Sequence, residues 1–526
     1  MKPGGLRSYR LELRRVHTWV AMATAVVLVF TACTSGGHPR PRPGSTLDQA
    51  GSPSPSDGPP LVQCEDRGDL ECGSVDVPLD RANPDAGTIS IAFYVHRHTD
   101  TRAPAAEPIF ATPGGPGSGG LDVMEFALTI DTIVEHHDIV AIDPRGTGQS
   151  GAIDCPDLQN GWSTNHELQV AVAACGEQLG DAADRYGAGD IAMDVEAVRR
   201  ALGYDQIDYY AFSYGTVPEQ AYAVRFLEHV HALVFDAGLS VTDPAHVWAW
   251  GLGVPADLVR AVALMCTRAR VCHVPDPAAT LRWFVHRVAS DPLRGRVQRP
   301  GGRPHGVVVD EAEAANLLRS TGTCVVCGQI DPAQMMNAIT SSRKGDPEAL
   351  LGLADIHSRG PLVRPPDPSD YSGGDNIAAL CNDQDFVWNR TDSIDARKRK
   401  FHIAMTALPK DEFAPFSLRG WNAFAWPGGC LTWPAPDRFE PAVPPNAEFP
   451  DLPTLILAGD SDTIVPPVVV ETLHDEFPRA AFITVAGAAH PVTGPAWGHC
   501  AAELVAQLFD TLKVGDASCA KTPASV

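Results

Sequence analysis

The stretch Ile207-Asp208-Tyr209-Tyr210-Ala211-Phe212-Ser213-Tyr214-Gly215-Thr216 decides the fold of this chain. Its apolar first part predicts a buried strand, and a helix-compatible run, Glu219 to Val230, follows the serine. A serine in this position, with small residues two places to either side, is typical of a sharp turn that exposes the hydroxyl above a parallel sheet. Gly215 tolerates such a turn, whereas Ala211 adds a methyl group where the pattern usually has glycine. We therefore predict a nucleophile at Ser213.

Strand signals recur on both sides of this stretch, at residues 89–94, 108–111, 139–142, 233–235, 454–458 and 482–485. Amphipathic runs such as 191–202 lie between them, and this alternation predicts an α/β fold with a mostly parallel sheet. From about Ser240 to Glu440, helix-like stretches dominate, at 255–266, 310–318 and 331–339, with loops expected at 299–305 and 360–374. We expect an inserted, mainly helical lid there, and a last helix over 501–512.

A serine nucleophile needs a histidine base, which in turn needs a carboxylate to orient it. In this fold class the order along the chain is Ser, Asp or Glu, then His. Two aspartates, Asp460 and Asp462, follow the strand 454–458, and we favour Asp462 because it lies further into the loop. His490 follows the next strand, and its rival His499 adjoins a cysteine, which favours a structural role.

The oxyanion of an acyl-transfer reaction must be met by backbone N–H groups. Tyr214, directly after the serine, is expected to supply one donor. The glycine loop Thr112-Pro113-Gly114-Gly115-Pro116-Gly117 is expected to supply the other. Prolines have no N–H, so Gly115 is the favoured donor, ahead of Gly114 and Gly117. A phosphate-binding role for this loop is weaker, because no lysine follows it.

The first 33 residues combine arginines with a short apolar run and end in Thr31-Ala32-Cys33. This pattern predicts an export signal, and the run is short for a membrane span. The ending resembles the lipidation site of bacterial lipoproteins. Lipidation of Cys33 would tie the chain to a membrane. Ordinary secretion or an uncleaved anchor are the alternatives. Residues 34–60 are rich in Pro, Ser and Gly and predict a solvated linker.

Cys33 apart, twelve of the thirteen cysteines remain, an even number that suits disulfides in an oxidising compartment. Their spacing suggests the pairs Cys64/Cys72, Cys155/Cys175, Cys266/Cys272, Cys324/Cys327, Cys381/Cys430 and Cys500/Cys519. A redox pair or half a zinc site is the alternative for Cys324 and Cys327.

The formal net charge of −23 argues against nucleic-acid binding, because a phosphate-binding protein needs a positive field. Nothing in the sequence calls for a metal or an organic cofactor.

Several motifs resemble, in order, the prolyl/tripeptidyl aminopeptidase branch of the α/β-hydrolases, and in particular its actinobacterial exported tripeptidyl-aminopeptidase-like members. They are 114–117, 143–150, 213–216, the loops of Asp462 and His490, Ala379-Leu380-Cys381 with Asp383, Cys430-Leu431-Thr432-Trp433-Pro434, and the region of Cys500. The resemblance covers roughly residues 61–520 and implies an exported serine peptidase or esterase with Ser213, Asp462 and His490 as its triad. Asp143 and Arg145 resemble a family signature that we interpret as structural, a buried ion pair or a turn brace rather than catalytic groups.

The expected organisation is a signal peptide (1–33), a linker (34–60), the first part of an α/β-hydrolase core (61–240), a helical lid (241–440) and the second part of the core, a TAP-like C-terminal region (441–526). We expect an exopeptidase that releases short peptides from free N-termini. A carboxylesterase with the same triad is one alternative. A catalytically silent surface binding protein is the other.

Overall fold

The computed structural model describes residues 59–523 apart from 66, 162–164, 244–246, 271, 299–301, 323–329, 358–366, 385, 425 and 436–439. The predicted signal peptide, Cys33 and nearly all of the predicted linker therefore lie outside the described residues. No helix in the described ranges is both long enough and apolar enough to cross a membrane.

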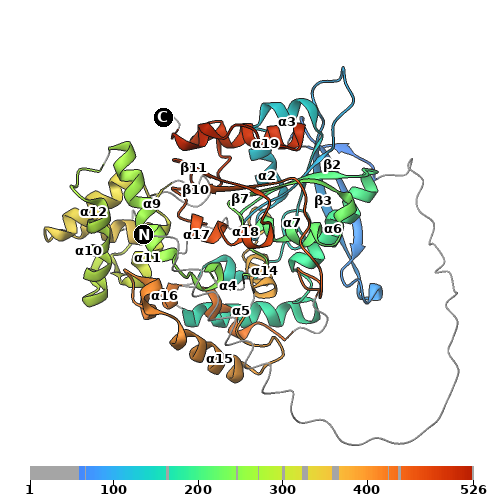
Figure 1. Cartoon of the computed structure of the whole chain (residues 1–526). Helices are drawn as coiled ribbons and strands as arrows, with labels where there is room; N and C mark the ends of the chain where they lie inside the picture. The colour runs from blue at the N-terminus through green and yellow to red at the C-terminus, as the bar shows by residue number, and fades with distance from the viewer. Residues whose placement is uncertain are drawn as a thin grey trace, which may run out of the picture. The chain divides into compact units, whose positions relative to one another are not determined.

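A nine-stranded sheet forms the centre of the fold, with the strand order β1-β2-β3-β5-β4-β6-β7-β10-β11 (Figure 1). Its strands are β1 (Val62–Gln63), β2 (Glu71–Pro78), β3 (Thr88–His96), β4 (Ile109–Thr112), β5 (Ile139–Ile142), β6 (Ile207–Phe212), β7 (Val230–Asp236), β10 (Thr454–Gly459) and β11 (Ala481–Val485). All pairs from β5 to β11 are parallel, whereas β1, β2 and β3 join antiparallel at one side. The sheet is thus mostly parallel, as predicted.

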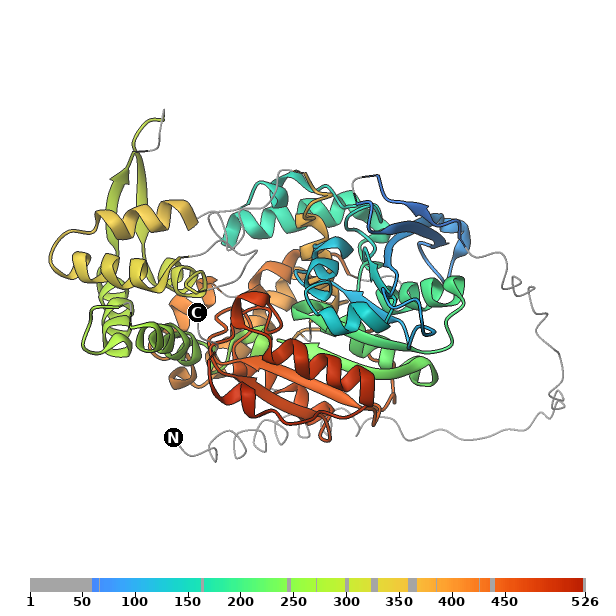
Figure 2. The same cartoon turned by 90° about the horizontal axis from the view of Figure 1, so that it is seen from above.

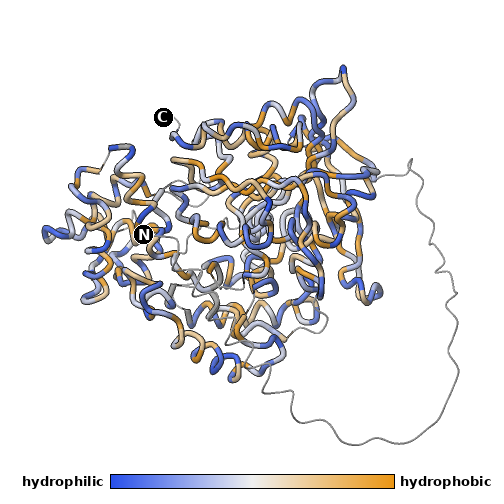
Figure 3. The backbone as a smooth tube through the Cα atoms, viewed as in Figure 1, coloured by the Kyte–Doolittle hydropathy of each residue, from blue (hydrophilic) through white to orange (hydrophobic). Residues whose placement is uncertain are grey.

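Helices cover both faces of this sheet. Figure 1 shows α3 (Asp131–His136) and α19 (Cys500–Thr511) above it, and α6 (Ala188–Leu202), α7 (Thr216–Ala223), α17 (Pro467–Val470) and α18 (Leu473–Glu476) below it. Helix α2 (Gly120–Ala127) packs on β4 and β5. Strands β4, β5, β6 and β10 are buried at every position, which explains their continuous apolar runs. Those runs form an apolar band through the sheet in Figure 3.

The segment between β7 and β10 is mainly helical, as expected of a lid. Its helices are α8 (Val247–Trp250), α9 (Val254–Ala269), α10 (Pro277–Ser290), α11 (Glu311–Arg319), α12 (Pro332–Arg343), α13 (Glu348–His357), α14 (Gly373–Asp383), α15 (Ile394–Ala407) and α16 (Leu418–Phe424). Helices α9 to α13 and α16 enclose a second hydrophobic core that includes Leu258, Phe284 and Met336. An antiparallel hairpin, β8 (Leu293–Val297) and β9 (His305–Val309), lies beside these helices (Figure 2). The short helix α4 (Pro156–Gln159) and the longer α5 (Asn165–Leu179), which come before β6 in the chain, pack with α14.

Three local predictions differ from the structure. The helix expected over 219–230 ends at Ala223, and Val230 already begins β7, because pairing of β7 with β6 and β10 overrides the local helix preference. The loop expected over 360–374 gives way to α14 at Gly373, where the Ser372 hydroxyl caps the helix by accepting the N–H of Asp375. His305, placed in a loop, begins β9.

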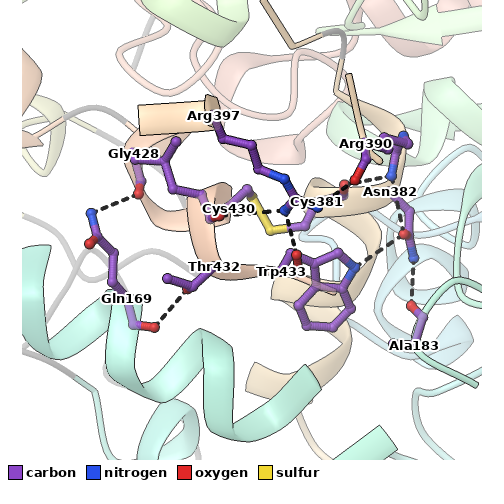
Figure 4. The surroundings of a disulfide bond; sticks show 11 residues. Gln169, Ala183, Cys381, Asn382, Arg390, Arg397, Gly428, Cys430, Thr432 and Trp433 are labelled. Atoms are coloured by element: carbon purple, nitrogen blue, oxygen red, sulfur yellow. Dashed lines mark hydrogen bonds between the residues drawn. A yellow bond between two sulfur atoms is a disulfide. The ribbon is translucent and has the colours of Figure 1, made fainter. Parts of the chain in front are cut away.

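Five disulfides join cysteines that the spacing had paired: Cys64–Cys72, Cys155–Cys175, Cys266–Cys272, Cys381–Cys430 and Cys500–Cys519. Cys324 and Cys327 lie outside the described residues. The Cys381–Cys430 bond ties α14 to the segment 426–432 (Figure 4). Beside it, the Trp433 indole donates to the Asn382 side chain over 3.2 Å. Helix α14 is thus held in place at its C-terminal end.

Candidate active site

The turn after β6 carries Ser213 in a left-handed conformation. Ser213 has φ of 58°, which is uncommon for a residue with a side chain and is found where surrounding structure enforces it. A Cβ atom at Gly215 would lie 2.5 Å from the carbonyl oxygens of Thr112 and Pro113, so this position requires glycine. Ala211, by contrast, lies in extended strand paired with Thr112 and Phe235. The alanine therefore does not prevent the turn from forming.

Three hydrogen bonds hold this turn, two of them to residues in other parts of the sheet edge. The Thr216 hydroxyl donates to the carbonyl of Ser213 over 2.7 Å and accepts the N–H of Leu239 at 3.0 Å. The Thr112 hydroxyl donates to the carbonyl of Gly215 over 3.1 Å. Because the partners come from β4 and from the loop after β7, the serine is held by the body of the sheet as well as by its own helix.

The glycine loop after β4 lies directly against Ser213. A Cβ atom at Gly114 would approach the Ser213 Cβ to 2.8 Å, so glycine is needed there for the two backbones to pass. Gly115 and Gly117 have φ of 112° and 106°, values that L side chains rarely adopt. The loop that carries the expected second N–H donor is thus next to the serine.

Asp462 and His490 meet at the same edge of the sheet, after β10 and β11. The Asp462 Oδ2 atom lies 2.9 Å from His490 Nδ1, and its Oδ1 atom accepts the N–H groups of Ile464 and Val465. Both side chains are buried, Asp462 completely. The backbone bonds hold the carboxylate in one orientation, so it in turn orients the imidazole ring.

The two rival residues lie elsewhere. Asp460 pairs with Arg268 of the lid helix α9 through two contacts of 2.5 and 2.6 Å, and also accepts the N–H of Gly487. The Arg268 pair and these hydrogen bonds hold the pKa of Asp460 below its usual value, against the effect of burial. His499 is exposed and precedes helix α19. The structure therefore pairs Asp462, rather than Asp460, with His490.

Helices of the inserted segment contact the loop that carries Asp462 and the helix after it. The Thr463 hydroxyl donates to the carbonyls of Arg319 and Thr321 at the end of α11. In helix α17, which follows this loop, the N–H of Val468 donates to Asp257 of α9. These contacts attach α9 and the end of α11 to the loop that carries Asp462 and to α17, so the positions of these elements are linked.

The signature residues Asp143 and Arg145 brace the sheet edge separately rather than forming an ion pair with each other. Asp143 accepts the N–H groups of Gly120 and Gln149 at 2.6 and 2.7 Å. The fully buried Arg145 forms a two-pronged contact with Asp194 of α6, at 2.6 and 2.7 Å. Both residues are structural in this arrangement, as interpreted from the sequence.

Comparison with known families agrees with this fold. Residues 107–256 match the family described as alpha/beta hydrolase fold, and residues 418–519 match the TAP-like protein family. The chain is an α/β-hydrolase. The TAP-like match begins at residue 418, within the range 241–440 that the sequence assigned to the lid.

Three known proteins are similar in sequence to this α/β-hydrolase over most of its length. The serine protease Hip1 of Mycobacterium tuberculosis is 27% identical over 90% of this chain and 89% of its own length. The tripeptidyl aminopeptidase of Streptomyces lividans is 27% identical over 81% of this chain and 79% of its own length. Carboxylesterase B of M. tuberculosis is 29% identical over 72% of this chain and 73% of its own length. The predicted family and the prediction of a serine hydrolase are confirmed.

One contact of the turn at Ser213 was not anticipated from the sequence. The phenol of Tyr214 donates to the buried carboxylate of Asp383, at the end of α14. The same carboxylate accepts the N–H of Ala188 at 2.9 and 3.0 Å. Burial raises the pKa of Asp383 to about 6, and the bonds from Tyr214 and Ala188 oppose that rise. The residue expected to supply an oxyanion N–H is thus anchored through its own side chain.

Proposed function

We propose that this α/β-hydrolase is an exported serine exopeptidase that releases short peptides from free N-termini. The observation that carries the proposal is the 2.9 Å contact between His490 Nδ1 and Asp462 Oδ2, at the sheet edge where Ser213 follows β6. The names of two relatives, a serine protease and a tripeptidyl aminopeptidase, support a peptide substrate. The sequence pattern of residues 1–33 supports export.

In the proposed reaction the Ser213 hydroxyl attacks the scissile carbonyl, and His490 accepts its proton. The N–H groups of Tyr214 and Gly115 stabilise the oxyanion that forms. The acyl-enzyme releases its first product when His490 returns the proton to the leaving amine, and water then hydrolyses the ester. Asp462 orients the ring and stabilises its protonated form.

The rest of the chain has proposed roles as well. Residues 1–33 act as the signal peptide, and lipidation of Cys33 with the linker 34–60 holds the enzyme at a membrane surface. The lid, 241–440, limits access to chain ends, while 61–240 and 441–526 form the hydrolase core. The contacts of Thr463 and Val468 with the lid support a lid that acts on the site directly.

A carboxylesterase is the second candidate, favoured by the 29% identity to carboxylesterase B. The two are separated by assaying the full chain on a chromogenic tripeptide with a free amino group, on its N-acetylated twin, and on a short-chain ester. Each assay is repeated with Ser213→Ala. Cleavage of the free-amine peptide alone, lost in the variant, supports the exopeptidase; turnover of the ester alone replaces it with the esterase. No cleavage by the wild type contradicts both.

A further inference from the structure

Asp236 ends strand β7, between the strand that leads to Ser213 and the strand that leads to Asp462. In the sheet register it lies level with Phe212 of β6 and with Leu457 of β10. It is not a member of the predicted triad. Its carboxylate nevertheless occupies the middle of the edge at which the site is built.

The carboxylate of Asp236 binds the loop of His490. Its Oδ1 accepts the N–H of Val492 at 2.7 Å, and its Oδ2 accepts both the N–H and the hydroxyl of Thr493, at 3.0 and 2.5 Å. The Tyr210 phenol of β6 approaches the same Oδ2 at 3.3 Å and the Thr493 hydroxyl at 2.6 Å. Two sheet strands therefore hold the chain two and three residues after His490.

The Asp236 side chain is fully buried, so its bonds are not exchanged for water. Burial raises the pKa of Asp236 above its usual value, and the bonds from Thr493 and Val492 and the charge of His490 oppose that rise. All its contacts come from groups able to donate hydrogen bonds, which suits an ionised carboxylate. By the same electrostatic interaction, its negative charge stabilises positive charge on the His490 ring.

We propose that Asp236 is a positioning residue that fixes the loop of His490 and places a second negative charge, besides that of Asp462, near the ring that is protonated during catalysis. Asp462 holds the imidazole through Nδ1, and Asp236 holds the backbone that carries it. The inference rests on the proposed function, since it assigns the residue to the same reaction.

The first test compares Asp236→Asn with a matched control, Asp208→Asn. Asp208 is an equally buried carboxylate near the start of the neighbouring strand β6, away from the site. The asparagine side chain has the same shape as that of Asp236 but only one acceptor oxygen. Its NH₂ group would face one of the groups that donate a hydrogen bond to Asp236. We expect kcat to fall about 10- to 100-fold with KM changed less than about twofold. Because a negative charge near the ring is lost, the acidic limb of the pH profile should also move to lower pH.

The control should keep its kcat and its pH profile. An unchanged kcat in Asp236→Asn, an equal loss in Asp208→Asn, or an unmoved acidic limb would contradict the proposal. A fall in kcat that merely follows a fall in folded protein, measured by thermal melting, would contradict it too.

A second measurement keeps the test independent of the natural substrate and of the folding of Asp236→Asn. Thr493→Val removes one donor to Asp236 but leaves the backbone bonds, so we expect a three- to tenfold slower reaction of Ser213 with a fluorophosphonate probe. Wild-type protein that is not labelled at Ser213 contradicts the proposed function itself. Labelled wild type with an equally fast Thr493→Val variant contradicts the role of the Asp236 cluster alone.

Discussion

Two histidine–carboxylate pairs lie at opposite edges of the same sheet. At the edge of the candidate site, His490 Nδ1 and Asp462 are 2.9 Å apart, and at the other edge His231 Nδ1 and Asp208 are 2.8 Å apart. The contacts are nearly equal in length, and both carboxylates are fully buried. A histidine–aspartate contact is therefore not enough to indicate a catalytic base.

The difference lies in what surrounds each pair. Parallel strands end at the first edge, so loops after β4, β6, β10 and β11 meet there, and one of them holds Ser213 beside the glycine loop. At the second edge, Asp208 lies in β6 itself and His231 lies in β7. The carboxyl edge of a parallel sheet collects loops that can carry several chemical groups at once. Similar pairs thus have different expected roles.

The largest expected effect comes from removing each histidine in turn. In the proposed mechanism His490→Gln deprives Ser213 of its base, so kcat should fall by roughly 10⁴-fold or more. His231→Gln changes a contact at the distant edge and should leave kcat within about twofold. Steady-state assays of the two variants and the wild type measure both effects. Similar losses of kcat in the two variants would contradict the different roles expected of the two edges.

Much of this arrangement could be predicted from the sequence, because local signals carry it. The buried strands β4, β5, β6 and β10 are continuous apolar runs, and the turn at Ser213 is marked by its neighbours. Strand β2 was missed because it is only partly buried, with polar residues among the apolar ones. The hairpin β8–β9 was missed because its short strands lie within a mainly helical segment.

The supporting residues of the site could not be predicted in this way. Tyr214 and Asp383 are 169 positions apart, and Asp236 and Thr493 are 257 apart. Each contact depends on where the lid or the histidine loop folds back onto the sheet. A single sequence gives the residue types at these positions but not the pairing, because no local pattern links them.

An intermediate effect should come from the anchor of the nucleophile turn. Asp383→Asn removes the charge that accepts the Tyr214 phenol, so the turn loosens and kcat should fall about tenfold, or roughly 1.4 kcal/mol. Tyr214→Phe removes the same bond from its other end. If the bond accounts for both effects, the double variant should lose little more than either single variant. Fully additive losses in kcat/KM would show that the two residues act independently.

The smallest expected effect concerns stability at the edge of His231. The hydrogen bond that the His231 ring donates to Asp208 raises the pKa of His231, with burial opposing it, and burial raises the pKa of Asp208. For His231, the extra stability is fully present below about pH 6.5 and is lost as pH rises through the raised folded value. Because its pKa is raised, Asp208 also binds more protons in the folded state than in the unfolded chain. Its contribution to stability therefore also decreases as pH rises. The wild type should therefore melt at a lower temperature at pH 8 than at pH 6.

His231→Gln removes the histidine's share of this dependence, so its drop in Tm between pH 6 and pH 8 should be smaller by about 2 °C. His137 and Glu107 face the same cluster and stay unchanged in the variant. Calorimetric melts at the two pH values provide the measurement. The matched variant at the other edge, His490→Gln, should affect activity at every pH instead. A Tm slope in His231→Gln as steep as that of the wild type would mean that the distant pair does not couple folding to protonation, and that its short contact is only a packing feature of the sheet.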